Sequence, residues 1–361
     1  MMFPSGTYTV LVTPFNDDIE QTVNYKEIEQ WYKMQSNSKI TGLVSLGTTS
    51  ESPVLDDDEK LKIVKYIYDL NSESDNPKYL IAGIGGNNTI KTLQNALKYK
   101  NYCDAFMVTV PEYNKPTQEG IIEHFKFVCK HVELKNKPVI MYNIPSRTGV
   151  NATPETINII FTECKNILAI KEASGSIDQL IKIRTLCPDL LVFSGDDKLI
   201  LDFGIHGGAG VISVASNVIP NIISEIVNLT FNDIKKAMTL YYNIKLPQFI
   251  DALFCETNPI PVKYMMYLIG LYKNYDLRLP MLCLTSTKHK LVETVLDETI
   301  TIYMHKYLKY SDISAKLEMI KYDTNYIALK YLLMLEITDV MNKTDKPEIY
   351  TKYVKSKYLL L

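Results

Sequence analysis

The chain has 361 residues, 46% of them hydrophobic, and a formal net charge of −2. This length and composition allow a large buried core, and a pI near 6.3 gives no overall basic field that would favour nucleic acid or an anionic membrane. No apolar run approaches the roughly 20 residues of a membrane span, and the first residues do not resemble a signal peptide. We therefore expect a cytoplasmic protein that binds neither nucleic acid nor membrane.

Eight short runs rich in β-branched residues alternate with amphipathic stretches and are predicted to be strands. They lie at residues 7–15, 42–48, 78–85, 105–111, 138–145, 167–174, 190–197 and 210–216. Eight strand-then-helix units predict a closed parallel (β/α)8 barrel, the TIM barrel. An open doubly wound sheet also alternates strands and helices, and it is the alternative fold class.

Three of the intervening stretches carry clear helix signals. The stretch 56–70 begins with an acidic run at 56–58, which suits the positive end of a helix. Its apolar residues are predicted to share one buried face: Leu61, Val64, Ile67 and Tyr68. The stretches 117–132 and 153–165 each open on a threonine that can cap a helix.

Glycine usage suggests a domain boundary, because fourteen of the fifteen glycines precede residue 211. Residues 1–225 are expected to form the barrel and residues 226–303 a helical domain. Residues 304–361 keep apolar residues at helical spacing and are predicted to be a helical extension of unknown role.

The cysteines and histidines give little support for a metal site. The six cysteines are scattered without a C-x-x-C pair, and the five histidines form no H-E-x-x-H or H-x-H motif. The cysteines are therefore predicted to be reduced core thiols.

Lys171 follows directly on the buried sixth strand, in the segment AIKEASG. In a parallel barrel the carboxyl ends of the strands line the active site. A lysine at this position can extend to solvent or pair with a carboxylate at the rim. A buried lysine can instead act as a nucleophile that forms a Schiff base with a carbonyl group. Residue types alone leave both roles open.

Polar residues also follow the other strands, and each has a structural alternative. Tyr142 ends strand five level with Lys171 and can transfer a proton, or it can bond to backbone. Arg147 can present a planar fork to a substrate carboxylate, or form a surface ion pair. Thr48 and Thr49 can hold a carboxylate with hydroxyls and turn amides, or simply cap a turn. The remaining polar strand ends lie at 112–114, 194–197 and 211–213.

Seven segments, most of them at successive strand ends, resemble the dihydrodipicolinate synthase and N-acetylneuraminate lyase family of class I aldolases. The likeness extends over residues 6–300, and its segments are GTTSES, YNKPTQEG, YNIPSRTG, AIKEASG, FSGDD, GGAGVISVASNV and ETNPIPVK. The resemblance implies the (β/α)8 barrel with a helical C-terminal region.

The resemblance also implies a mechanism. Lys171 would condense with the ketone of pyruvate, and the resulting imine would lose a methyl proton to give an enamine that attacks an aldehyde. The matching proton-relay residues are Thr48, Tyr142 and Tyr113, with Tyr113 reaching into the site of a neighbouring subunit. The imine serves as the electron sink, so no metal or organic cofactor is expected.

Further site residues follow from the same resemblance. Thr48 and Thr49 would hold the pyruvate carboxylate, and Ile212 would face the keto acid through its backbone. Gly195 and Asp196 match the lip of the second-substrate pocket. Because Tyr113 is shared between subunits, the resemblance implies a homotetramer, with a homodimer as the alternative.

Two positions favour a synthase in lysine biosynthesis over a sialic acid lyase. Like this chain at residues 47–49, the synthases typically have the sequence G-T-T, and like it they have an arginine at the position of Arg147. An arginine there suits the carboxylate of L-aspartate semialdehyde. Ser50 departs from the family, whose members nearly always have glycine there, and it would be strained if the turn needs a positive φ.

Feedback control is expected to be absent. Members that bind lysine as an inhibitor usually have a glutamate at the position of Lys91 and an aromatic residue at that of Glu112. In this chain the positive charge of Lys91 would repel the ammonium group of the inhibitor, and the negative charge of Glu112 would repel its carboxylate.

Three functions therefore compete. The first is condensation of pyruvate with L-aspartate semialdehyde. The second is an aldolase acting on a sugar-derived 2-oxo acid, such as N-acetylneuraminate or 2-keto-3-deoxygluconate. The third is a non-enzymatic scaffold whose extension binds a partner, which the presence of Lys171, Tyr142 and Thr48 argues against.

Overall fold

The computed structural model of the chain describes residues 3–131, 134, 136–307 and 327. These residues belong to two compact units. The first consists of the described residues of Met1–Leu240 together with Asp276–Leu282. The second consists of Tyr241–Tyr275 and the described residues from Cys283 onward.

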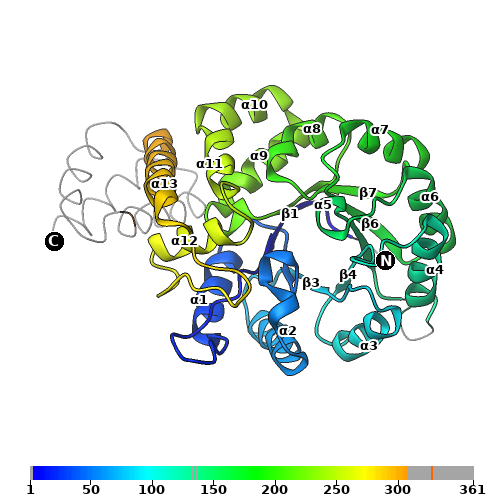
Figure 1. Ribbon diagram of the computed structural model, residues 1–361. Helices are drawn as coiled ribbons and strands as arrows, with labels where there is room; N and C mark the ends of the chain where they lie inside the picture. Colours follow the sequence, from blue (N-terminus) through cyan, green and yellow to red (C-terminus); the bar gives the residue numbers. More distant parts are fainter. Residues whose placement is uncertain (1–2, 132–133, 135, 308–326, 328–361) are drawn as a thin grey trace. The chain divides into compact units, whose positions relative to one another are not determined.

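The first unit is built on eight parallel strands that close into a barrel in chain order, with β8 paired to β1 (Figure 1). The strands are β1 (Gly6–Val10), β2 (Gly42–Ser45), β3 (Tyr79–Gly83), β4 (Ala105–Thr109), β5 (Val139–Asn143), β6 (Ile167–Glu172), β7 (Leu191–Ser194) and β8 (Gly210–Ser213). Each lies within one of the eight predicted runs or begins one residue before it. The (β/α)8 barrel is therefore confirmed, and the open sheet is excluded.

Helices follow the strands and lie around the outside of the barrel (Figure 1). They are α1 (Tyr25–Ser36), α2 (Asp57–Ser72), α3 (Thr89–Tyr99), α4 (Gln118–Cys129), α5 (Pro145–Thr148), α6 (Pro154–Glu163), α7 (Ile177–Leu186), α8 (Ile200–Ile205) and α9 (Pro220–Asn232). Short 3-10 turns also follow strands of the described chain: η1 (Thr48–Ser50), η2 (Ser52–Val54), η4 (Asp197–Leu199) and η5 (Ala215–Asn217).

The predicted helix starts are confirmed. Asp56 caps α2 in a capping box with Glu59, so the acidic run does lie at the positive end of this helix. Thr117 and Thr153 each accept a hydrogen bond from a backbone amide of the first turn of α4 and α6.

The predicted buried face of α2 is partly wrong. Val64 and Ile67 are buried as expected, but the third buried residue is Ile63, while Leu61 is only half-buried and Tyr68 is 39% exposed. The buried stripe is therefore rotated relative to the predicted one. Leu61 and Tyr68 lie at the edge of the buried face of the helix, and they are therefore only partly covered.

The described part of the chain after β8 consists mainly of helices, as predicted. Helix α10 (Ile234–Asn243) is followed in the second unit by α11 (Leu246–Leu253), α12 (Ile260–Leu268) and α13 (Ser286–Tyr307), and α13 packs against both α11 and α12. The predicted domain boundary at residues 225 and 226 falls inside α9. The predicted extension 304–361 lies outside the described residues except for the end of α13 and residue 327.

The structure also bears on two further predictions from the sequence, the state of the cysteines and the lack of a membrane span. None of the six cysteines, all of which are described, forms a disulfide; four of them are buried as predicted, whereas Cys255 and Cys283 are half-buried. Within the described ranges, no helix has both the length and the apolar character needed to cross a membrane.

The barrel interior is filled by a cluster of apolar side chains to which all eight strands contribute. Ala169 and Ile140 belong to this interior cluster. Because side chains on one face of a strand repeat every second residue, Lys171 and Tyr142 face the interior as well. The register places Tyr142 directly beside Lys171, and Phe193 of β7 on the other side of Lys171. The barrel therefore carries one ammonium group at the top of an apolar core.

Candidate active site

Lys171 is buried, with only 6% of its surface exposed. Its Nζ lies 4.2 Å from the centre of the Tyr142 ring, within the range of a cation–π contact. No carboxylate among the described residues forms an ion pair with it. The burial and the absence of an ion pair argue against a lysine that extends to solvent or pairs with a rim carboxylate.

Glu172, the neighbour of Lys171, faces the opposite side of β6 and is fully engaged there. Its Oε2 accepts hydrogen bonds from Asn143 Nδ2 and Gln179 Nε2, both at 3.0 Å, and its Oε1 accepts one from the Ser174 amide at 2.6 Å. Asn143 Oδ1 in turn accepts from the Ala152 amide. This network fixes the ends of β5 and β6, which carry Tyr142 and Lys171.

No role was predicted for Glu172 or Asn143 from the sequence. A signal was present, because each directly follows a candidate site residue and the two are paired in the register. A buried carboxylate at a strand end needs several donors, and its strand partner is the nearest place to find one.

Gly195 lies at the end of β7 beside Lys171. A Cβ atom at this position would lie 2.6 Å from Ala173 Cβ and 3.1 Å from Lys171 Cε. The absence of a side chain therefore leaves the room that the Lys171 chain occupies. The next residue, Asp196, is half-buried and caps η4 by accepting a hydrogen bond from the Lys198 amide.

Asp197 ties the end of β7 to the loop after β8. It is 1% exposed and accepts hydrogen bonds from Ser213 Oγ (2.5 Å), the Val214 amide (2.9 Å) and the Ala215 amide (3.1 Å). Burial raises the pKa of this carboxyl above its ordinary value. No role was predicted for Asp197 from the sequence, although it directly follows Asp196.

Ile212 is 1% exposed and belongs to the same interior cluster as Tyr142. It lies on β8, one residue before Ser213, the donor to Asp197. Lys171, Tyr142, Gly195 and Ile212 therefore lie on adjacent strands around one end of the barrel.

The segment Thr48–Ser50 forms the 3-10 turn η1 after β2. Thr49 is buried and Thr48 is half-buried. The expected strain at Ser50 is not present, because the left-handed residues near this turn are Leu46 and Glu51. Ser50 Oγ instead donates to the Leu11 carbonyl at 2.7 Å, which joins this turn to the end of β1.

Comparison with known proteins identifies the family. The model of the dihydrodipicolinate synthetase family matches residues 3–299. The chain belongs to this family.

Named relatives agree with this assignment. The 4-hydroxy-tetrahydrodipicolinate synthase of Endomicrobium trichonymphae is 39% identical over 279 residues, which cover 77% of this chain and 92% of that protein. The solved dihydrodipicolinate synthase of Thermotoga maritima is 34% identical with a TM-score of 0.76, covering 82% of this chain and 98% of that one. The synthase of Methylacidiphilum fumariolicum gives a TM-score of 0.78 at 32% identity, covering 83% and 97%.

Two family positions lie apart from the interior of the barrel. Tyr113 is 83% exposed and has a left-handed backbone with φ of 68°. Its amide donates to the Thr148 carbonyl, which joins the loop after β4 to α5. Arg147, on α5, is exposed. The described chain therefore does not place these two side chains in the enclosed part of the site with Lys171.

Replacing Gly195 with alanine tests the spacing around Lys171. We expect Gly195→Ala to destabilise the fold by about 1–3 kcal/mol through overpacking and to slow imine formation with pyruvate at least tenfold. Gly86→Ala is the matched control, because the nearest atom to its Cβ is Glu112 Oε1 at 4.0 Å. Thermal unfolding and borohydride trapping measure both effects. Unchanged trapping in Gly195→Ala would show that the site does not need this space.

Proposed function

We propose that the protein condenses pyruvate with L-aspartate semialdehyde through an imine on Lys171, the reaction of a 4-hydroxy-tetrahydrodipicolinate synthase. The observation that carries the proposal is the buried Lys171 amine, which faces Tyr142 at the carboxyl end of the barrel without an ion-pair partner among the described residues. Family membership supports it, because members are pyruvate-dependent class I lyases that form a lysine Schiff base.

The reaction needs a neutral amine and a proton relay. Lys171 attacks the ketone carbon of pyruvate, and loss of water gives a cationic imine. The imine withdraws electrons from the adjacent methyl group, which loses a proton to give an enamine. The enamine carbon attacks the aldehyde carbon, a carbon–carbon bond forms, and a proton goes to the new alkoxide. The amino group of the added semialdehyde unit then attacks the imine carbon and displaces the Lys171 amine, which closes the ring of the product, so the cycle uses no metal or organic cofactor.

The proton transfers are assigned to hydroxyl groups. Tyr142 is assigned the transfers at the amine, because its ring lies beside Nζ. Thr48 would connect Tyr142 to Tyr113 of a second subunit. Thr48 and Thr49 would hold the pyruvate carboxylate with the hydroxyls and amides of η1, and the Ile212 backbone would face the keto acid.

The second substrate would enter over the lip formed by Gly195 and Asp196. Arg147 would then bind the carboxylate of L-aspartate semialdehyde, for which a guanidinium fork has the matching geometry. This residue separates the proposed substrate from sugar-derived 2-oxo acids, which place hydroxyl groups in that region.

A substrate panel tests the proposed function. The protein should consume pyruvate with L-aspartate semialdehyde and should not cleave N-acetylneuraminate or 2-keto-3-deoxygluconate. Arg147→Ala should raise the KM for the semialdehyde about tenfold or more, as expected for a lost charged hydrogen bond, with the KM for pyruvate unchanged. Arg147→Lys keeps the positive charge but not the planar fork. Its KM for the semialdehyde should therefore lie between those of the unmodified protein and Arg147→Ala. Faster cleavage of either sugar acid would overturn the proposal.

Assembly provides a second test, because an exposed Tyr113 can act only if another subunit receives it. We propose a homotetramer built from dimers that share Tyr113. Tyr113→Phe and Lys171→Ala should each be nearly inactive, yet mixed and allowed to exchange subunits they should regain activity. Sedimentation should show four subunits. A fully active monomer, or a mixture that stays inactive although the subunits exchange, would contradict the shared site.

Feedback inhibition by lysine is predicted to be absent. Lys91 pairs with Asp57 in the structure, and its ammonium lowers the pKa of that carboxyl. Asp57 is therefore already occupied and cannot readily take the ammonium of an inhibitor. Activity should be unchanged by millimolar lysine, and Lys91→Glu combined with Glu112→Tyr should introduce some sensitivity. Saturable inhibition of the unmodified protein would show that this prediction is wrong.

A further inference from the structure

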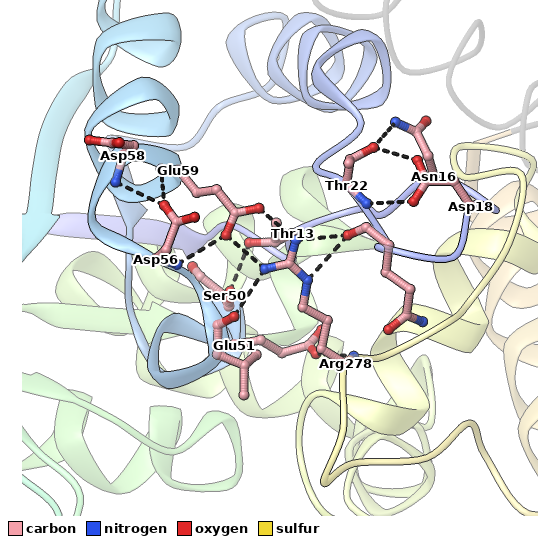
Figure 2. Close-up of polar contacts among 12 residues, drawn as sticks. Thr13, Asn16, Asp18, Thr22, Ser50, Glu51, Asp56, Asp58, Glu59 and Arg278 are labelled. Atoms are coloured by element: carbon pink, nitrogen blue, oxygen red, sulfur yellow. Dashed lines mark hydrogen bonds and ion pairs between the residues drawn. The ribbon is translucent and has the colours of Figure 1, made fainter.

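Arg278 lies in Asp276–Leu282, the short segment that belongs to the barrel unit although it follows the second unit's α12 in the chain. Its side chain is 16% exposed and its guanidinium group is surrounded by polar partners (Figure 2). An arginine this far from Lys171 in sequence would ordinarily be given only a role in stabilising the fold. The contacts of Arg278, however, connect it to the turn that carries Thr48 and Thr49.

All five N–H donors of the guanidinium are used. Nη1 donates to Glu59 Oε2 (2.7 Å) and the Val54 carbonyl (3.0 Å), and Nη2 donates to Glu59 Oε1 (2.5 Å) and the Gln21 carbonyl (2.8 Å). Nε donates to the same Gln21 carbonyl at 3.2 Å. The face of the group lies over the Phe15 ring, 4.6 Å from its centre. Only an arginine offers five donors in one plane, so a lysine cannot reproduce this set.

These partners come from segments that adjoin η1. Phe15 and Gln21 lie in the loop after β1, Val54 ends η2, and Glu59 belongs to the first turn of α2, where it also accepts from the Asp56 amide. Arg278 therefore links the loop after β1, the end of the loop after β2 and the start of the next helix.

The backbone of Arg278 reaches η1 more directly. Its amide donates to Glu51 Oε2 at 3.1 Å (Figure 2), and the Glu51 amide donates to the Thr48 carbonyl at 3.1 Å. Glu51 is 3% exposed and has a left-handed backbone with φ of 54°, a conformation that a non-glycine residue adopts only when its surroundings hold it there. Arg278 supplies one of those contacts.

The other side of η1 is held by the loop after β1. Thr13 Oγ1 donates to the Ser50 carbonyl, and Ser50 Oγ donates to the Leu11 carbonyl, both at 2.7 Å. Thr48 and Thr49 thus precede a turn end that is held by two sets of contacts, from the β1 loop at Ser50 and from Arg278 at Glu51.

We propose that Arg278 is a positioning residue for pyruvate binding, which keeps Thr48 and Thr49 in the geometry that receives the keto-acid carboxylate. It does not touch the substrate. The inference rests on the proposed function, in which these two threonines hold that carboxylate. It predicts a defect specific to pyruvate, whereas a role limited to fold stability predicts only a loss of folded protein.

The experiment follows imine formation alone, by borohydride trapping at increasing pyruvate concentrations without the semialdehyde. The variants are Arg278→Lys and Arg278→Ala in the full chain, each assayed well below its melting temperature. Arg184→Lys is the matched control, because Arg184 also donates to two backbone carbonyls, those of Pro188 and Leu190, but on α7. The half-saturating pyruvate concentration is the readout, since it does not depend on how much protein is folded.

We expect Arg278→Lys to raise the half-saturating pyruvate concentration at least tenfold, while the KM for the semialdehyde changes less than twofold and Arg184→Lys matches the unmodified protein. A reduced trapping amplitude with an unchanged half-saturation would overturn the proposal and leave Arg278 a structural residue. If Arg278→Ala does not fold, Arg278→Lys alone decides. If the unmodified protein traps no pyruvate, the proposed function itself fails, and the two failures are thereby distinguished.

Discussion

Removal of the Lys171 amino group from water is the constraint on which the rest of the site depends. An ammonium group in an apolar interior is unfavourable unless a partner compensates it, and here the nearest compensation is the face of the Tyr142 ring. The strand order of the barrel creates this environment, because it places β5 and β7 on the two sides of β6. Gly195 then leaves the space that the lysine chain needs.

Buried carboxylates fix the strand ends around this amine. Glu172 joins the ends of β5 and β6 to the start of α7, and Asp197 joins β7 to the turn after β8. Glu51 and Glu59 do the same for the loop after β2 through Arg278. In each case a carboxylate on one segment accepts hydrogen bonds from donors on its neighbours, so the rim is held by side chains that take no part in the proposed chemistry. Their common effect is to hold the reacting groups in place before substrate arrives.

The sequence predicted the fold well, because its signals are local. The β-branched runs identify all eight strands, and Thr117 and Thr153 identify helix starts from their own neighbours. It also predicted that Tyr142 lies beside Lys171, since both end adjacent parallel strands.

What the sequence could not predict depends on distant chain segments. Arg278 meets Glu59 across 219 positions, and neither residue's surroundings in sequence indicate the other. The buried stripe of α2 includes Ile63 instead of Leu61 and Tyr68, because the contact with the barrel, and not the helix period alone, decides which edge is covered. The turn does not need a positive φ at Ser50, so the condition for strain there is not met, and a left-handed residue lies one position later, at Glu51. Ser50 is instead held by the carbonyl of Leu11, which directly follows β1 and lies 39 positions earlier in the chain.

The central claim is that Lys171 is the amine that reacts with pyruvate, and mass mapping of a reduced adduct tests it most directly. Pyruvate followed by borohydride should add one pyruvate-derived group per chain, located on the peptide that contains AIKEASG, and Lys171→Ala should remove it. An adduct that persists in Lys171→Ala, or that maps to a different lysine, would contradict the account.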